Sequence, residues 1–407
     1  PADEATQPVF EAKAALPGLS TAFGGVHVSA VPHRVIVEDA VDAIAIGEAD
    51  SSFPALLDRW SRREDGPPPP GVWTKEDGKL LKGDNHSMPE DLDSLPFPAK
   101  DLFYSRVPAL ERHYMIMSAR GCPYNCTYCY KSLSASHPPG AKPVRRRSPE
   151  NVMEELRHVA ARGLARMIVF RDDVFTLQKK WLEEFTEAYA REIRLPYFCY
   201  THPSAINEHS ADLIREGGCT FVTMGVQSVD ERQRREVLNR KYTNEQVRNS
   251  MALLKERGIS VSVDHIAGIP GDTEEKLLEA AHFYNELRPH RLLSFWLTYY
   301  PGTEIVEKAI EAGMLDESDR ERIEKGGVGY RYSGGGSRGL DERLHRVTTL
   351  MSLIPLLPAG IMKKLISRRA HRRLPAGYWF NNILLFLNAL KTRDPFFFYN
   401  IRFFLSR

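Results

Sequence analysis

The sequence predicts an α/β fold whose centre is a partial barrel of strand–helix units. Short apolar runs alternate with amphipathic stretches from residue 114 onward, and the alternation repeats about six times. Such alternation is typical of a parallel sheet covered by helices. No Gly-x-Gly-x-x-Gly turn interrupts the pattern. We therefore expect a partial (β/α)6 barrel of the TIM type in preference to a dinucleotide-binding sheet.

The expected elements of the barrel follow from apolar periodicity. Strands are predicted at 114–118, 166–170, 197–200, 220–225, 260–267 and 292–299. Helices are predicted between them at 149–162, 177–191, 205–216, 244–257 and 273–287. Ser148-Pro149-Glu150 and Asp272-Thr273-Glu274 have the residue types that begin helices. In such barrels the chemistry lies at the carboxyl ends of the strands, so the residues after each strand are the candidates for function.

A smaller α/β unit is expected in residues 1–65. A helix is predicted at 6–16, strands at 19–23 and 41–46, and another helix from residue 51. Four consecutive prolines then introduce a stiff connector, and residues 66–111 show little periodicity, so we expect a linker there. The barrel is assigned to 112–305 and a basic, apolar helical domain to 306–407.

Composition restricts the class of protein. Of the 407 residues, 42% are hydrophobic and 27% charged, as in ordinary globular proteins. No apolar run reaches the roughly 18 residues that span a bilayer, and the first residues lack the apolar core of a signal peptide. The chain does not begin with Met, and we expect it to start inside a longer protein. Scarce, clustered cysteines indicate a reducing cytoplasm and no disulfide framework; isolated Cys199 and Cys219 are expected to be buried in strands.

The carboxyl-terminal part is strongly basic. Residues 343–407 hold twelve Lys and Arg and one acid, a net of +11, so the remainder carries about −9 of the overall +2. Apolar helices are predicted at 350–362, 378–390 and 396–405, after a Gly- and Ser-rich loop or lid at 330–339. Apolar faces beside basic clusters suit an anionic membrane surface, and equally a helical cap packed on the barrel. The apolar bulk argues against nucleic acid.

The most informative motif follows the first barrel strand. Cys122, Cys126 and Cys129 have the spacing Cys-x3-Cys-x2-Cys, with Tyr128 before the last cysteine. Three thiolates on one short loop can ligate one soft metal centre. Two centres are considered: a 4Fe–4S cluster with one iron lacking a protein ligand, or a structural zinc ion with His113 or His137 as fourth ligand. No second Cys-x2-Cys arm exists, which favours the cluster.

This motif resembles the signature of radical S-adenosylmethionine (SAM) enzymes, and the resemblance extends over about residues 112–305. It implies a 4Fe–4S cluster on the three cysteines and SAM bound at the open iron. Reductive cleavage of SAM then gives a 5′-deoxyadenosyl radical that abstracts hydrogen from an unactivated carbon.

Further residues match the family at the ends of later strands. Asp172 and Asp173 begin an Asp-Asp-x-Phe-Thr motif that could meet the SAM ammonium group, although one carboxylate could instead cap a helix. Gln227 and Ser228 belong to a Gly-x-Gln-Ser edge expected at the ribose and carboxylate. Arg240 could pair with the SAM carboxylate or be a solvated charge. The resemblance assigns an adenine-binding role to Ile266 and Gly268, in a segment where Asp264 replaces the family's first Gly.

The first unit resembles the last third of cobalamin-binding domains that precede such barrels. The residues that carry this resemblance are Gly24, Gly25, His27, Gly47 and Glu48. The family's Asp-x-His-x-x-Gly loop, whose His can ligate cobalt, is absent, so cobalamin is implied by a remnant and His27 is expected beside the cofactor. Gly-Gly after a strand is otherwise simply a turn.

These resemblances predict a cobalamin-dependent methyltransferase. The alternative within the family is an enzyme that catalyses cyclisation or rearrangement. A hypothesis from another class of protein is a binding module, stabilised by zinc, that docks on membranes. We expect a small-molecule substrate, with a lipid or hydrophobic natural product favoured, and an external electron donor. The expected location is the cytoplasm, with peripheral contact at the inner membrane surface.

Overall fold

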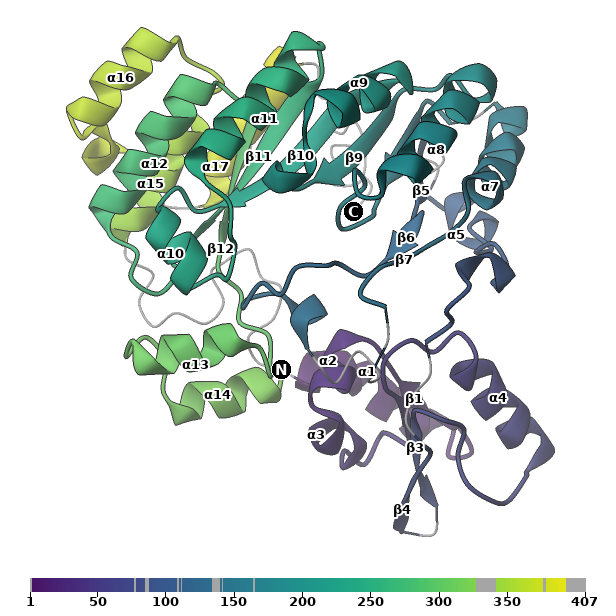
Figure 1. The fold of residues 1–407 in the computed structure, drawn as a ribbon. Coiled ribbons are helices and arrows are strands. Elements are labelled where there is room, and N and C mark those ends of the chain that lie inside the picture. Colours follow the sequence, from purple (N-terminus) through teal and green to yellow (C-terminus); the bar gives the residue numbers. More distant parts are fainter. Residues whose placement is uncertain are drawn as a thin grey trace.

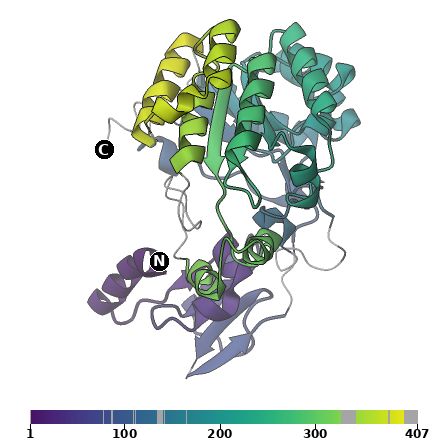
Figure 2. The same ribbon diagram turned by 90° about the vertical axis from the view of Figure 1, so that its left-hand side faces the viewer.

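A computed structural model describes residues 2–326, 342–375 and 378–392, apart from 77, 85–87, 108–109, 111, 134–139, 141 and 164. Figures 1 and 2 show a small amino-terminal unit beneath a larger strand–helix unit, with further helices of the carboxyl-terminal part beside the last barrel strand. The short antiparallel pair of β6 (Ala119–Arg120) and β7 (Arg145–Arg146) lies on the side of the barrel that faces the amino-terminal unit.

The amino-terminal unit is built on a four-stranded sheet of order β1-β2-β3-β4. The strands are β1 (Ala22–Phe23), β2 (Ala43–Ala45), β3 (Val72–Glu76) and β4 (Lys79–Lys82). The helices are α1 (Ala2–Ala15), α2 (Val26–Ala30), α3 (Pro32–Ile36) and α4 (Ser52–Arg62). The first two strands are parallel, as the α/β pattern predicts, and Ile36 and Ile44 are fully buried between sheet and helices.

The linker expected at 66–111 is wrong for residues 72–82. This stretch forms the antiparallel pair β3 and β4, and β3 pairs with β2 to extend the amino-terminal sheet. Val72 and Thr74 are buried there, while Gly78 turns the chain with a φ of +74°. The signal in the sequence is the Asp77-Gly78 dipeptide, a typical hairpin turn between short strands. Beyond the hairpin the connector contains only η1 (Leu92–Ser94) and α5 (Asp101–Tyr104) among its described residues.

The barrel has the predicted strands in one parallel sheet of order β12-β11-β10-β9-β8-β5. They are β5 (His113–Ile116), β8 (Met167–Phe170), β9 (Tyr197–Thr201), β10 (Cys219–Gln227), β11 (Ser260–Ala267) and β12 (Arg291–Trp296). Consecutive strands are neighbours, and β5 and β12 remain as the two edges. The sheet is therefore an open, partial barrel, as the alternation predicts.

Helices cover one face of this sheet (Figure 1). They are α7 (Pro149–Arg162), α8 (Lys179–Glu192), α9 (Glu208–Glu216), α11 (Asn244–Glu256) and α12 (Glu274–Leu287), with the shorter η4 (Pro203–Ala205) and α10 (Glu231–Glu236). Side chains of Ser148, Thr243 and Thr273 accept hydrogen bonds from backbone amides of the first turns, which defines where three of these helices begin.

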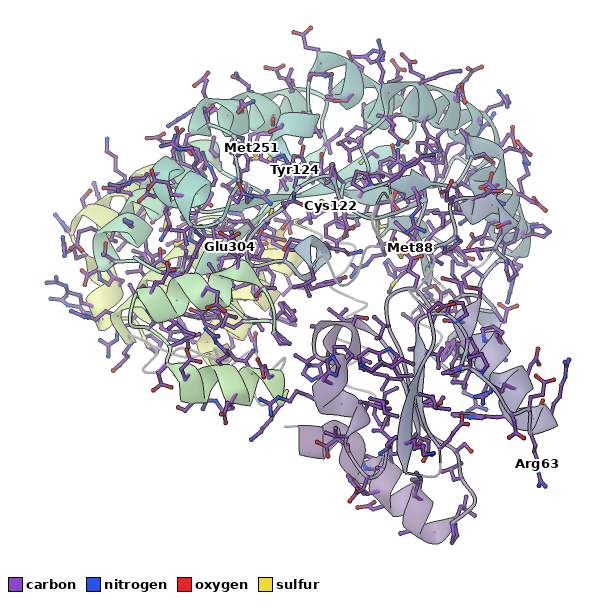
Figure 3. The ribbon with its side chains drawn as sticks, turned by 60° about the horizontal axis from the view of Figure 1, so that its bottom comes forward. Arg63, Met88, Cys122, Tyr124, Met251 and Glu304 are labelled. Carbon is purple, nitrogen blue, oxygen red and sulfur yellow. The ribbon has the colours of Figure 1, made fainter. Side chains whose placement is uncertain are left out.

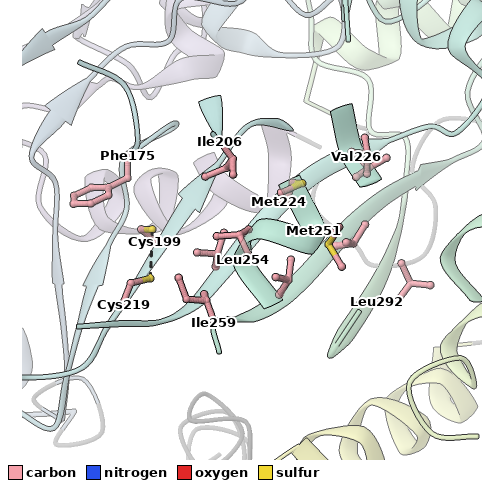
Figure 4. Packing of buried hydrophobic residues seen from close by; sticks show 14 of the residues in the cluster. Phe175, Cys199, Ile206, Cys219, Met224, Val226, Met251, Leu254, Ile259 and Leu292 are labelled. Atoms are coloured by element: carbon pink, nitrogen blue, oxygen red, sulfur yellow. Dashed lines mark hydrogen bonds between the residues drawn. The ribbon is translucent and has the colours of Figure 1, made fainter. Parts of the chain in front are cut away.

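The main core lies between these helices and the sheet. Figure 4 shows its aliphatic and sulfur-containing side chains, among them Met224, Val226 and Met251. Cys199 and Cys219 are fully buried in neighbouring strands as predicted, with their Sγ atoms 4.0 Å apart. A separate cluster of Met167, Val169, Phe198 and Phe221 lies on the opposite, inner face of the sheet.

Helices follow the barrel in the described part of the carboxyl-terminal region. They are α13 (Glu304–Glu311), α14 (Glu317–Glu324), α15 (Glu342–Ser352), α16 (Ala359–Ser367), η5 (Ala370–Arg373) and α17 (Tyr378–Thr392). The single helix expected at 350–362 is wrong: α15 ends at Ser352 and α16 begins after Pro358. Pro355 and Pro358 lie between them, and proline cannot continue a helix without losing a backbone bond. The loop expected at 330–339 and the helix expected at 396–405 lie outside the described residues.

Several of these helices pack on the barrel. Val347, Leu350, Met362 and Ile366 belong to the same core as the barrel helices. The predicted helical cap is therefore present in the described residues. None of the described helices combines the length and hydropathy needed to cross a bilayer.

Candidate active site

The three clustered cysteines line one cavity of about 180 Å³ at the carboxyl ends of the barrel strands. Cys126 is buried, whereas Cys122 and Cys129 are partly exposed. Figure 3 shows Cys122 beside Tyr124 near the middle of the molecule. Tyr128, Asp173, Gln227 and Arg240 line the same cavity, so seven of the predicted site residues come together from four separate parts of the sequence.

A tight turn brings the cysteine loop away from the end of β5. Gly121 has a φ of +93°, and a Cβ atom there would lie 2.1 Å from the carbonyl oxygen of Pro143. Only glycine fits this position, because both the backbone conformation and the contact with neighbouring backbone exclude a side chain. The β6–β7 pairing, whose first strand ends just before Gly121, fixes the direction in which the loop leaves the barrel.

The loop is docked on the segment after α10. Thr127 donates a hydrogen bond from Oγ1 to the carbonyl of Val237, at 2.6 Å, and Asn239 donates from Nδ2 to the carbonyl of Asn125, at 2.7 Å. The backbone amide of Ile305 donates to the carbonyl of Thr127. Two distant segments thus hold the backbone on both sides of Cys126.

Arg240 is buried against the cysteine loop. Its guanidinium lies 3.4 Å from the Cys126 Sγ, donates to the Gly225 carbonyl at 2.7 Å and contacts the Tyr128 hydroxyl at 3.3 Å. The expected alternative of a solvated charge is therefore wrong, since only 8% of the residue is exposed. The position suits a cation that balances negative charge at the thiolates or at a bound carboxylate.

Asp172 and Asp173 have different surroundings. Asp172 is buried and accepts hydrogen bonds from the backbone amides of Ser118 and Ala119, at 2.6 and 3.1 Å, and from the Ser118 hydroxyl. Arg146 lies 3.4 Å away. Burial raises the pKa of Asp172, against the opposing effects of Arg146 and these hydrogen bonds. Its carboxylate holds the end of β5 and is not among the groups that line the cavity.

Asp173 does line the cavity, where its carboxylate forms an ion pair with Lys131 at 3.2 Å. The rest of the Asp-Asp-x-Phe-Thr motif is structural. Phe175 is fully buried in an aromatic cluster with Phe170 and Trp181. Of the two predicted carboxylates, Asp173 is the one available to a ligand.

Gln227 reaches the cavity through an irregularity of β10. Its φ is +65°, uncommon for a residue other than glycine, and the pairing of β10 with β11 shifts register between Gly225 and Gln227. A Cβ atom at Gly225 would lie 2.5 Å from the Gln227 Nε2. Such strained positions are frequent at binding sites. Glycine at 225 therefore gives the Gln227 amide room to turn toward the cavity.

Three predicted SAM-binding residues are not among the residues that line this cavity. Ser228 is buried and donates to the Gln233 side chain at 2.8 Å. Ile266 packs in a cluster with Leu238 and Ile269. Gly268, with a φ of +78°, faces the Trp296 ring. Their roles toward SAM stay predictions.

The cavity also contains residues that the sequence patterns do not single out. Lys131, Tyr200 and Thr223 are among them, and His202 stacks on Tyr124 with ring centroids 4.0 Å apart. Asp264, which stands where the resembled motif has its first Gly, also lines the cavity. Burial, with the charges of Arg240 and Arg234, lowers the pKa of His202 to about 2, so the ring is neutral at physiological pH. Tyr200 and His202 could have been found in the sequence by their position, because they lie at the carboxyl end of a barrel strand.

The residues expected to bind cobalamin lie at the carboxyl ends of the first two strands of the amino-terminal sheet. Gly24 and Gly25 follow β1, His27 lies in α2, and Gly47 and Glu48 follow β2. The Glu48 carboxylate accepts hydrogen bonds from Arg120, at 2.7 Å, and from Arg145. Arg120 also pairs with Asp50. This edge of the amino-terminal unit is therefore joined to the segment that leads into the cysteine loop.

Three thiols on one loop are a donor set that fits an iron–sulfur cluster with one iron left without a protein ligand. Burial raises the pKa of Cys122 to about 11 and also raises that of Cys129, so ionised thiols there need a compensating positive centre. In the described residues no three His, Cys, Asp or Glu side chains are close enough to ligate a single ion. A cluster is larger, and its corner ligands are farther apart. His113, offered as a zinc ligand, begins β5, whereas the loop follows the other end of that strand; His137 lies outside the described residues.

Comparison with known proteins agrees with this geometry. Residues 116–284 match the family model described as the Radical SAM superfamily. This match includes the three cysteines and extends into α12, over less than half of the 407 residues. An uncharacterised methyltransferase of Pyrococcus horikoshii is 29% identical over 296 residues, which cover 72% of this chain and 63% of the relative.

Two solved structures have the same fold. The radical SAM methyltransferase TsrM from Kitasatospora setae, with cobalamin and a 4Fe–4S cluster bound, has a TM-score of 0.62 at 18% identity, covering 77% of this chain and 61% of TsrM. The cobalamin-dependent radical enzyme OxsB, with aqua-cobalamin and SAM bound, has a TM-score of 0.66 at 13% identity, covering 98% and 64%. The chain thus spans less than two thirds of each of these three proteins.

Proposed function

We propose that this protein is a radical SAM enzyme that methylates an unactivated carbon with the help of cobalamin. The observation that carries the proposal is the meeting of Cys122, Cys126 and Cys129 in one cavity at the carboxyl ends of the barrel strands. When bound, a 4Fe–4S cluster supplies the electron that cleaves SAM to a 5′-deoxyadenosyl radical, and cobalamin supplies the methyl group.

The side chains around the thiols would bind SAM. Asp173 supplies a carboxylate for the ammonium group, and Arg240 a guanidinium for the carboxylate. Gln227 and Tyr128 add neutral polar groups. Ser228 would serve the ribose and carboxylate, while Ile266 would cover the adenine face and the backbone around Gly268 would bind the adenine edge; none of the three is among the residues that line the cavity of the cysteines. Arg240 at the Cys126 Sγ would also offset charge on the thiolate.

Cobalamin would lie between the amino-terminal unit and the barrel. Gly24, Gly25 and Gly47 follow parallel strands, and ligands of doubly wound sheets bind at that edge. Glu48 anchors the same edge to Arg120 and Arg145. His27 is half-buried, and burial lowers its pKa, so a neutral ring faces any cofactor there. The bound cobalamin in TsrM and OxsB, both of the same fold, supports this assignment.

Methyl transfer is the leading reaction, because the Pyrococcus horikoshii relative and TsrM are both described as methyltransferases. Cyclisation or rearrangement by the same radical is the alternative. The zinc-stabilised docking module is disfavoured, since in the described residues no trio of ligands is close enough for a single ion.

We further propose a small, largely apolar substrate, such as a lipid or hydrophobic natural product, and an external electron donor in the cytoplasm. The inner face of the barrel carries Met167, Val169, Phe198 and Phe221, which suits an apolar molecule. The exposed apolar residues Ile383, Leu387 and Leu390 of α17, with the basic α16–η5 segment, support contact with the inner membrane surface.

Substitution of Cys126 by Ala tests the proposal. The variant should keep a folded barrel, because Thr127 and Asn239 still dock the loop, but lose iron and SAM cleavage. The measurement is 5′-deoxyadenosine formed under anaerobic, reducing conditions, with Cys199→Ala, which lies outside the cavity, as the control. If Cys126→Ala still forms 5′-deoxyadenosine at the wild-type rate, the assignment is wrong.

A further inference from the structure

A buried glutamine outside the cysteine cavity joins two separate loops of the barrel. Gln233 lies in the short helix α10 and is only 4% exposed. Its Oε1 accepts a hydrogen bond from the Ser228 hydroxyl, and its Nε2 donates one to the Asp272 Oδ1, both at 2.8 Å. Ser228 follows β10 and Asp272 follows β11. The side-chain amide therefore connects the ends of two neighbouring strands.

The chemistry of the two partners fixes the direction of this amide. An ionised carboxylate can only accept hydrogen bonds, so the amide nitrogen must face Asp272 and the amide oxygen must face Ser228. The Ser228 hydroxyl then donates its proton to Gln233, and its oxygen can still accept a hydrogen bond. A ribose hydroxyl of SAM can donate to that oxygen. Gln233 thus determines how Ser228 presents itself to a ligand.

The Asp272 carboxylate carries the connection into the loop that follows β11, where adenine is expected. Its Oδ2 accepts a hydrogen bond from the backbone amide of Ile269 at 3.0 Å. On the other side of the loop, a Cβ atom at Gly268 would lie 2.9 Å from the Trp296 ring, so this ring limits how far the loop can shift. The loop is therefore held between Trp296 and the Gln233 amide.

The charge of Asp272 suits this role at neutral pH. Burial raises the pKa of Asp272 to about 6, while the hydrogen bonds from Gln233 and two backbone amides, and the charge of Lys276, oppose this shift. Tyr299 also faces the carboxyl group, and burial together with the Asp272 charge raises the pKa of its hydroxyl. The carboxyl group is therefore mostly ionised at neutral pH and accepts the amide proton of Gln233.

The same short helix leads into the contacts that hold the cysteine loop. The carbonyl of Val237, just after α10, accepts the hydrogen bond from Thr127. Arg240, three residues further, lies beside the Cys126 Sγ. The α10 region therefore contacts three parts of the expected SAM site: the cysteine loop, Ser228 and the loop after β11. Gln233 is the side chain that joins the second part to the third.

We propose that Gln233 is a positioning residue for SAM, which sets the distance between Ser228 and the loop after β11 so that ribose and adenine bind together. This inference rests on the proposed function, because it takes those two segments to bind SAM. Without the amide, the Ser228 hydroxyl loses its acceptor and Asp272 loses a donor, and the two segments are no longer held in register. The nucleoside half of SAM then binds more weakly.

Two ligands test the proposal: SAM, and 5′-methylthioadenosine, which has the ribose and adenine of SAM without the amino-acid part. Their dissociation constants are measured by calorimetry on the anaerobically purified full-length protein with its metal centre intact. Gln233→Leu, which removes the amide and keeps much of the side-chain volume, should weaken both ligands at least about tenfold, the effect of losing a hydrogen bond to a charged group. In SAM cleavage, its KM for SAM should rise by more than kcat falls.

Asn285→Leu is the matched control. Asn285 is also a buried side-chain amide, which donates to the Ala359 carbonyl at 3.0 Å and accepts from Arg288 at 2.9 Å. It lies at the opposite end of α12 from the loop after β11. This variant should keep both dissociation constants within about twofold of wild type, because distant sites act independently. Equal losses in Gln233→Leu and Asn285→Leu would contradict a role in positioning.

A variant of conservative shape gives a readout that a purely structural role would not produce. In Gln233→Glu at pH 8, two ionised carboxyl groups face each other and no donor joins them. As the pH falls to 6, the two groups share a proton, which restores the hydrogen bond. The affinity of this variant for 5′-methylthioadenosine should therefore increase as the pH falls, and that of Gln233→Leu should show no such gain.

The outcomes separate this inference from the proposed function. If the wild type binds neither ligand, the proposed function falls and the role of Gln233 falls with it. If the wild type binds SAM and forms 5′-deoxyadenosine while Gln233→Leu, with a wild-type circular dichroism spectrum, binds both ligands equally well, only the role of Gln233 is wrong. A loss of affinity confined to the Gln233 variants supports it, whether or not a methylated product is found.

Discussion

At the scale of single residues, adjacent carboxylates have separate tasks. Asp172 is buried and binds the backbone amides of Ser118 and Ala119, just before the cysteine loop. Asp173 lies in the cavity and pairs with Lys131. Burying two neighbouring carboxylates together is costly. Here each carboxylate has its own hydrogen-bond or ion-pair donors, backbone amides for Asp172 and Lys131 for Asp173.

The first prediction separates these tasks. Asp172→Asn should lower the free energy of unfolding by roughly 2–4 kcal/mol, because charged hydrogen bonds are weakened and Arg146 loses its buried partner. Asp173→Asn, the matched control, should change stability by less than about 1 kcal/mol but weaken SAM binding about tenfold. Denaturant unfolding and equilibrium dialysis with SAM measure the two effects. The reverse pattern would show that Asp172 is the SAM ligand.

The sequence predicts the cysteine ligands well because metal ligation requires fixed residue types at fixed spacing. Arg240 is harder to place, since nothing in its local sequence shows that Gly225 leaves room for its guanidinium. His202 could not be assigned, because its place in the cavity depends on which strand ends meet across the sheet. Local sequence patterns therefore do not predict site residues whose position depends on long-range packing.

At the scale of elements, the barrel strands and helices follow the predicted order, because the apolar periodicity and the helix-capping residues indicate the same elements. The helix at 149–162 and the strand at 260–267 have the predicted bounds. The predictions fail where tertiary pairing decides: β3 and β4 extend the amino-terminal sheet, and the prolines at 355 and 358 separate α15 from α16. Short strands with mixed polarity give too weak a periodic signal.

A buried ion network attaches the connector to α7. Glu155 accepts from Lys100 at 2.6 Å, from the Tyr114 hydroxyl at 2.7 Å and from Arg147 at 2.6 Å. Burial alone would raise the pKa of Glu155, but the two cations and the hydroxyl outweigh it and lower the pKa. Since the folded pKa lies below the unfolded value of 4.5, the stabilisation is complete above that pH and is lost as the pH falls through the folded pKa.

The second prediction follows from this network. Glu155→Gln should lower the free energy of unfolding by about 3 kcal/mol at neutral pH, because Lys100 and Arg147 lose their shared counter-charge. The difference from wild type should shrink as the pH falls below 4.5. Urea unfolding across this range measures it, with Glu150→Gln on the exposed face of the same helix as control. A difference independent of pH would contradict the assignment.

At the scale of the whole molecule, ion pairs join the amino-terminal sheet to the barrel. Glu48, at the edge of the amino-terminal sheet, pairs with Arg120 and with the buried Arg145, next to the cysteine loop. An ion pair between Arg34 and Glu324 also joins this unit to α14, but it is largely exposed. The Glu48 contact is the one positioned to align a cofactor with the barrel.

The third prediction concerns this contact. Glu48→Ala should weaken retention of hydroxocobalamin by the full-length protein at least about tenfold, because Arg145 loses its partner and the two units lose their alignment. Corrin absorption after gel filtration measures retention. Arg34→Ala should have little effect, since exposed ion pairs contribute under about 1 kcal/mol. Unchanged retention in Glu48→Ala would show that cobalamin does not use this edge.

The central claim is that Cys122, Cys126 and Cys129 hold a cluster with one iron free for SAM. Electron paramagnetic resonance of the anaerobically purified, reduced protein tests it most directly, together with metal analysis. We expect about four irons per chain and a cluster signal that changes when SAM is added. One zinc per chain, or a cluster signal that SAM leaves unchanged, would contradict it.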